Sequence, residues 1–111
     1  MSWLSMEQLT ASPAGLGDLR EDGTRCLPCH FKEEEQHMHR FPPALRRRLL
    51  AEHVAIERSF RSGRVPHALL EAHADLEDQA FPRYLPPALV ASFLADHASY
   101  RRKTPHWGCE Q

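Results

Sequence analysis

Prolines divide the chain from residue 29 onward into four segments, each with the length and apolar spacing of an α-helix. One proline or a proline pair stands where each later segment begins, a position at which the missing amide donor costs nothing. Runs of alternating β-branched residues, which predict strands, are nearly absent. The sequence therefore predicts an all-α fold, with helices over about 29–40, 43–61, 66–81 and 86–102.

Two stretches of the sequence resemble each other. FPPALRRRLLAEHVAIER and LPPALVASFLADHASYRR match at an offset of 44 residues, and the match pairs His53 with His97. Two helical hairpins of similar design predict a pseudo-symmetric four-helix bundle. We expect an irregular lead-in over 1–28, in which SMEQLTA forms a short helix or turn, then the bundle over 29–103 and a tail over 104–111.

The composition argues against several classes of partner. The 14 Lys and Arg nearly balance the 15 Asp and Glu, so there is no electrostatic case for binding nucleic acid. No apolar run approaches the roughly 20 residues of a membrane span. The start MSWLSMEQLTASPAG lacks the basic and apolar regions of a signal peptide. Three cysteines cannot all pair, so we expect a cytoplasmic, reducing environment.

Each predicted helix carries a histidine within its apolar row, the side that faces the core of a bundle. His53, for example, stands at helical spacing between Leu49 and Ile56. Such placement predicts that four helices direct one imidazole each toward a common centre. The four histidines are His30, His53, His73 and His97.

Three of these histidines are followed four residues later by a glutamate, a spacing that places both side chains on one helix face. An inward glutamate is costly unless it is paired or bound to a metal, and a set of imidazoles and carboxylates suits iron. In the alternative interpretation these groups are structural hydrogen bonders of a zinc-stabilised helical adaptor or assembly subunit. The predicted ligands of an iron centre, enough for about two ions, are His30, Glu34, His53, Glu57, His73, Glu77 and His97.

The motifs HFKEEE, LLAEHVAIE and LLEAHADLEDQAFP resemble, in that order, the helix motifs of the hemerythrin-like (HHE cation-binding) domain family. The resemblance covers about residues 29–84. It implies a four-helix bundle with a non-haem di-iron centre that binds oxygen, nitric oxide or a related small ligand. It also implies a role for five residues as iron ligands, with Glu57 where the family often has another. Those five are His30, Glu34, His53, His73 and Glu77.

The sequence departs from the family at one point. Family members carry a further ligand histidine on a helix before the first motif, and residues 1–29 contain no histidine. We expect the last helix to replace the family's first and to supply His97 instead. The departure leaves open whether two irons, one iron or another metal such as zinc or manganese is bound.

The cysteines suggest a separate site. Cys26-x-x-Cys29 has a counterpart in His106-x-x-Cys109 at the other end of the chain. Two such chelating pairs make a Cys₃His zinc site, and an up-down bundle would bring the two ends together. The alternatives are a reduced or redox-active pair of Cys26 and Cys29, or a c-type haem attached through Cys26-x-x-Cys29-His30. Haem attachment would require an export signal, which we do not see.

The function that these patterns predict is binding or sensing of oxygen, nitric oxide or a related small ligand at an open iron position. We do not expect an enzyme, because no separate substrate pocket or pair of nucleophile and base is evident. A c-type haem electron-transfer protein is the less favoured alternative. The sequence leaves a protein partner and self-association open.

Overall fold

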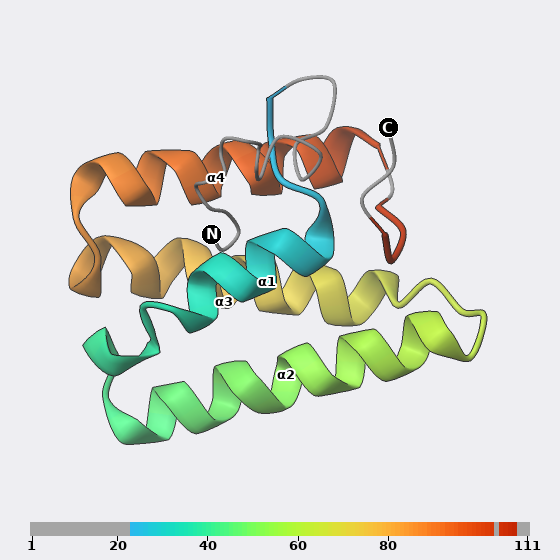
Figure 1. Ribbon diagram of the computed structural model, residues 1–111, viewed down its shortest axis with the longest axis horizontal. Helices are drawn as coiled ribbons and strands as arrows, with labels where there is room; N and C mark the ends of the chain where they lie inside the picture. Colours follow the sequence, from blue (N-terminus) through green and yellow to red (C-terminus); the bar gives the residue numbers. More distant parts are fainter. Residues whose placement is uncertain (1–22, 104, 109–111) are drawn as a thin grey trace, which may run out of the picture.

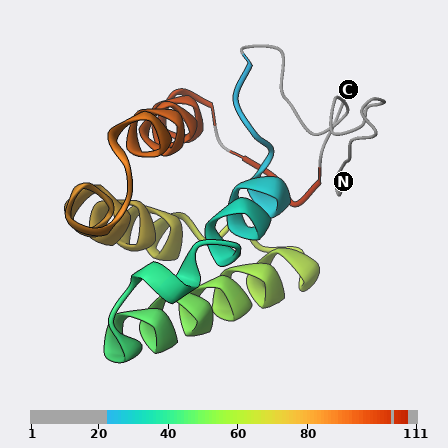
Figure 2. The ribbon, with the colours of Figure 1, turned by 60° about the vertical axis from the view of Figure 1, so that its left-hand side comes forward.

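The computed structural model describes residues 23–103 and 105–108 of the chain. In these residues it contains four α-helices and no extended strand, which confirms the predicted all-α four-helix bundle. The three longest helices run side by side, and the shortest completes the bundle beside them (Figures 1 and 2). The predicted short helix at SMEQLTA lies outside the described residues. The helical elements are α1 (Leu27–Glu35), the 3-10 turn η2 (Met38–Arg40), α2 (Pro43–Arg61), α3 (His67–Tyr84) and α4 (Pro87–Arg102).

The first helix is shorter than the sequence predicts. We expected one helix over about 29–40, whereas α1 ends at Glu35 and the 3-10 turn η2 follows. The backbone N–H of His37 bonds to the carbonyl of Glu34, three residues back, at 3.0 Å, so the chain tightens there. The tighter turn lets Met38 and Phe41 both enter the core, where they are 6% and 2% exposed.

The ends of α2 and α3 show how glycine and proline act locally. Gly63 has φ +87°, and the N–H groups of Gly63 and Arg64 bond back to the carbonyls of Phe60 and Ser59. This paired arrangement is a Schellman motif, which needs a residue in the left-handed conformation. The third helix was predicted to end at about residue 81, but α3 continues through Pro82 to Tyr84 because proline removes only one amide donor.

The core consists of a polar layer between two apolar clusters. One cluster lies where η2 and the α3–α4 connection meet, and includes Leu49, Phe81 and Phe93. The other includes Leu27, Phe31 and Ile56. Along α2, His53 falls between Leu49 and Ile56, and α3 and α4 likewise place polar residues between members of the two clusters, whereas α1 places His30 between Leu27 and Phe31 of the second cluster. Apolar packing therefore fixes all four helices around a polar centre.

Among the described residues, no helix combines the length and the apolar character needed to cross a membrane.

Candidate metal centre

The polar layer contains two groups of side chains whose ligand atoms converge. In each group these atoms lie within 4.8 Å of one another. Glu77 belongs to both groups, so its carboxylate joins them into one centre. The four-donor group consists of Glu34, His53, His73 and Glu77, and the three-donor group consists of His30, Glu77 and His97. All six residues are at most 4% exposed.

The distances within the four-donor group are compatible with a shared metal ion. His53 Nε2 lies 3.1 Å from Glu34 Oε1, and His73 Nε2 lies 2.6 Å from Glu77 Oε2. The two diagonal nitrogen–oxygen distances are 3.8 and 4.0 Å. Ligands of a tetrahedral metal with bonds of about 2.1 Å stand about 3.4 Å apart, a value that these distances bracket.

Five polar atoms of this group have no properly aligned hydrogen-bond partner in the described part of the chain. They are Oε1 and Oε2 of Glu34, Nε2 of His53 and of His73, and Oε2 of Glu77. Their neighbours are close, but the atoms point toward a shared centre rather than along N–H···O lines. Leaving such atoms buried and unsatisfied is costly. A cation at that centre would give one ligand atom of each of the four residues a partner, so the residues fit a bound metal ion.

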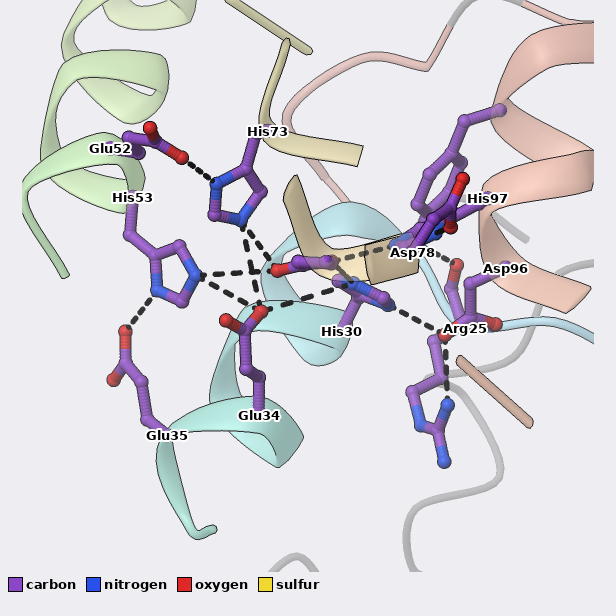
Figure 3. A network of polar contacts seen from close by, with 12 residues as sticks. Arg25, His30, Glu34, Glu35, Glu52, His53, His73, Asp78, Asp96 and His97 are labelled. Atoms are coloured by element: carbon purple, nitrogen blue, oxygen red, sulfur yellow. Dashed lines mark hydrogen bonds and ion pairs between the residues drawn. The ribbon is translucent and has the colours of Figure 1, made fainter. Parts of the chain in front are cut away.

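In each of the four histidines of the centre, Nδ1 contacts a carboxylate from a different helix, as Figure 3 shows for the labelled residues. The contacts from Nδ1 are to Asp96 for His30 (2.7 Å), to Glu35 for His53 (2.9 Å), to Glu52 for His73 (2.5 Å) and to Asp78 for His97 (2.7 Å). A carboxylate at Nδ1 fixes the tautomer that leaves Nε2 free to bind a metal. All four Nε2 atoms face the glutamates of the centre.

The contacts repeat between the two halves of the chain. Glu52 and His53 on α2 correspond to Asp96 and His97 on α4 at the offset of 44 residues. In α1 and α3 the matching offset is 43, which relates Glu34 to Glu77 and His30 to His73. The Nδ1 contacts are equivalent in the two halves: His30–Asp96 corresponds to His73–Glu52, and His53–Glu35 corresponds to His97–Asp78. The sequence repeat thus corresponds to a pseudo-two-fold arrangement of the polar layer.

The electrostatics of the centre favour positive charge on the imidazoles when no metal is bound. Burial acts to lower the pKa of these histidines, but the adjacent carboxylates outweigh it. They raise the pKa of His30 and of His53 to about 9 and that of His73 to about 11. The imidazoles of His30, His53 and His73 therefore hold positive charge in a site that also suits a cation.

The two glutamates differ from each other. Burial and the charge of Glu77 raise the pKa of Glu34. Burial also acts to raise the pKa of Glu77, but the neighbouring Glu34 carboxyl and the charges on His73 and His30 hold it well below its usual value. Glu77, the residue shared by both groups, is thus the more strongly anionic of the two.

A small cavity of about 20 Å³ adjoins the centre, with room for about one water-sized molecule. All three residues of the three-donor group line it, whereas only His73 and Glu77 of the four-donor group do so. The remaining wall is apolar or aromatic, formed by Leu27, Phe31, Leu70, Ala74 and Tyr100. The open side of the centre is therefore beside His30 and His97.

Six of the seven residues predicted as iron ligands come together in this centre, and Glu57 does not. Its side chain is 39% exposed and accepts a hydrogen bond from Arg61 at 2.7 Å. Four residues along a helix rotate a side chain by about 40°, and Ile56 takes the inward place beside His53. The carboxylates at Nδ1 were not predicted as site residues, although the pairing of Glu52 with Asp96 in the repeat was a signal for two of them.

The predicted zinc site is not assembled within the described residues. Cys109 lies outside them, so this assignment stays a prediction. Cys26 is disulfide-bonded, and Cys29 is a buried thiol. A sulfur in a disulfide is not available as a thiolate ligand, so zinc binding through Cys26 would require reduction. His106 is exposed.

Comparison with known proteins finds no family model, no curated protein and no solved structure that matches this chain.

Proposed function

We propose that the protein binds a dinuclear non-haem iron centre in its polar layer, and that it binds or senses a small ligand such as oxygen or nitric oxide there. The single observation that carries the proposal is the convergence of four imidazoles and two carboxylates, with Glu77 shared between both groups. A carboxylate with one oxygen directed to each group is suited to bridging two ions. When bound, such a pair of irons supplies an open position for a small ligand and a change of oxidation state.

The choice of iron rests on the chemistry of the donors. Imidazole nitrogens and carboxylate oxygens are a borderline-to-hard set, which suits iron better than it suits a metal that seeks thiolates. The arrangement also supports the proposal that the chain is a rearranged hemerythrin-like protein. His97 on α4 joins the three-donor group, and this is the ligand that the family places on a helix before the first motif.

The cavity supports a small and uncharged ligand. Its volume of about 20 Å³ suits a molecule of two or three atoms. Apart from the candidate ligands, its only polar group is the Tyr100 hydroxyl, which already donates to the carbonyl of Arg25 at 2.7 Å. Apart from the candidate ligands, the lining therefore offers an anion no free donor, and oxygen or nitric oxide needs none. The chain's own residues exclude bulk water and hold the imidazoles in place.

A zinc-stabilised structural protein is the second candidate. The four-donor group has the number of ligands of a structural zinc site. A structural zinc site would be closed, however, and would leave the three-donor group without a role.

Metal analysis tests the proposal. The purified chain is reconstituted without oxygen with ferrous iron or with zinc, desalted, and analysed for metal per chain. We expect about two irons per chain, visible absorption after oxidation, and a spectral change on adding nitric oxide to the reduced form. A colourless protein that keeps one zinc and no iron would refute the iron centre and favour the structural alternative.

A further inference from the structure

The four carboxylates that contact the histidines differ in burial. The side chain of Asp96 is only 2% exposed, whereas those of Glu52, Asp78 and Glu35 are 22, 33 and 47% exposed. A buried carboxylate needs compensating contacts far more than one that water reaches. Asp96 is therefore the carboxylate whose position depends most on the protein.

Arg25 supplies those contacts. Its backbone N–H donates to Asp96 Oδ1 at 2.9 Å, and its Nη1 donates to Asp96 Oδ2 at 2.8 Å. The same Oδ2 lies 2.7 Å from Nδ1 of His30. One residue of the segment before α1 thus holds both oxygens of the carboxylate that orients His30, as Figure 3 shows.

Arg25 is itself held on α4 by two more contacts. Its carbonyl accepts the hydroxyl hydrogen of Tyr100 at 2.7 Å, and its guanidinium lies 4.9 Å from the centroid of the Phe93 ring. An arginine fixed at backbone and side chain has little freedom left to lose. It can hold Asp96 in one orientation, and through Asp96 it can hold the ring of His30.

The equivalent place in the other half is built differently. His73 corresponds to His30, and its carboxylate Glu52 accepts a hydrogen bond from Nε of Arg48 at 3.2 Å. The Arg48 side chain is 63% exposed. Exposed pairs of this kind contribute little, because water screens them. The pseudo-two-fold symmetry of the centre is therefore broken at Arg25.

We propose that Arg25 is a positioning residue for the three-donor group and that, through Asp96 and His30, it makes this group a distinct second metal position. The four-donor group does not depend on Arg25 and fills first, because it has one more donor. The three-donor group fills second and needs the clamp. This inference rests on the proposed metal-binding function. It adds the order in which the two metal positions fill and the residue on which the second position depends.

A cobalt titration tests this proposal, because Co²⁺ reports its coordination through visible absorption. In the wild-type chain we expect two separable binding steps. His97→Ala should abolish the weaker step and His53→Ala should weaken the stronger one, which assigns each step to its group. Arg25→Gln should weaken the second step about 10-fold, the scale on which losing an outer-shell partner acts, and leave the first within about 2-fold.

The matched control is Arg48→Gln, the equivalent change in the other half, which should leave both steps within about 2-fold because the pair is exposed. Arg25→Lys keeps a charge beside Asp96 and should recover most of the lost affinity. Helix content of the metal-free variants by circular dichroism checks that they fold. If Arg25→Gln does not fold, Asp96→Asn is used instead, and the same selective loss is expected.

The outcomes distinguish the proposed dinuclear centre from the proposed role of Arg25. A wild-type chain that binds no Co²⁺, or only one, would refute the dinuclear centre itself. A wild-type chain that binds two, with Arg25→Gln and Arg48→Gln weakening both steps equally or neither step, would overturn the role of Arg25 alone. A selective loss in Arg25→Gln that Arg25→Lys restores would support it.

Discussion

Glu77 on α3 places its Oε1 atom 2.6 Å from Nε2 of His97 on α4. Its other oxygen faces the opposite side of the polar layer, where Oε2 lies 2.6 Å from Nε2 of His73. One carboxylate therefore connects the two groups of ligand atoms. Because it is fully buried and has a strongly lowered pKa, it carries the negative charge that either group would use to hold a cation.

Replacing Glu77 by glutamine should impair both metal positions at once. The variant keeps the size of the side chain but loses the shared charge, so we expect metal per chain to fall from about two to well below one. The matched control is Glu57→Gln, since Glu57 also stands four residues after a histidine but faces Arg61. Elemental analysis after reconstitution and desalting measures both. Equal metal loss in the two variants would contradict the assignment of Glu77 as the carboxylate shared by both metal positions.

Filling the cavity should block the small ligand and spare the metal. Ala74 lines the cavity beside His73, so Ala74→Leu would occupy the space of about one water-sized molecule. We expect nitric oxide to bind the reduced iron form at least about 10-fold more weakly, with unchanged iron content. Ala72→Leu, an exposed position on the same helix, should bind it normally. Unaltered nitric oxide binding in Ala74→Leu would contradict the proposal that the small ligand occupies this cavity.

The stability of the metal-free protein should fall as the pH rises from neutral. The pKa of His30 and of His53 is about 9 in the folded chain, against an ordinary value of 6.5. A raised folded-state pKa stabilises the fold fully below about pH 6.5, and this contribution is lost as the pH passes through about 9. Urea denaturation of the metal-free chain at pH 6.5, 7.5 and 9 measures the trend. A free energy of unfolding that rises over this range would contradict the predicted charges.

Metal binding should show the opposite dependence on pH. Each imidazole must lose its Nε2 proton to bind a cation, so binding releases protons and strengthens as the pH rises. The stabilisation that metal adds to the fold should therefore be larger at pH 8 than at pH 6.5. Comparing denaturation with and without metal at both pH values measures it. An equal stabilisation by metal at both pH values would indicate that metal binding does not displace protons from the imidazoles.

The apolar cluster beside the centre should contribute separately from the metal. Leu49 is completely buried among the residues of α2, α3 and α4, whereas its neighbour Leu50 is 37% exposed. We expect Leu49→Ala to lower the free energy of unfolding of the metal-free chain by about 2–5 kcal/mol. Leu50→Ala should change it by less than about 0.5 kcal/mol. Similar losses of stability in both variants would contradict the burial of Leu49 in the core.

Most of the candidate metal-binding residues were predictable from the sequence, because a histidine or glutamate in the apolar row of a helix is carried into the core together with that row. The same pattern also selected Glu57 wrongly. His53-x-x-x-Glu57 has the same spacing as His73-x-x-x-Glu77, and only the packing of α2, with Ile56 turned inward, separates the two cases. Helical periodicity alone does not resolve a rotation of this size.

The contacts that orient the ligands were not predictable in the same way. Asp96 precedes His97 in the sequence but contacts His30, 66 positions away on α1. Arg25 lies before the first helix, where no periodic pattern indicates a role. Such pairings depend on which helices lie together, and that is a property of the assembled bundle. The early end of α1 has a similar origin, since it follows from burying Met38 and Phe41 together.

Anomalous diffraction at the iron edge, from crystals of the iron-reconstituted chain, would show whether the polar layer holds two irons. We expect two peaks, one among Glu34, His53, His73 and Glu77 and one among His30, Glu77 and His97, with the Glu77 carboxylate between them. A single peak, or iron bound only outside the polar layer, would contradict the dinuclear centre.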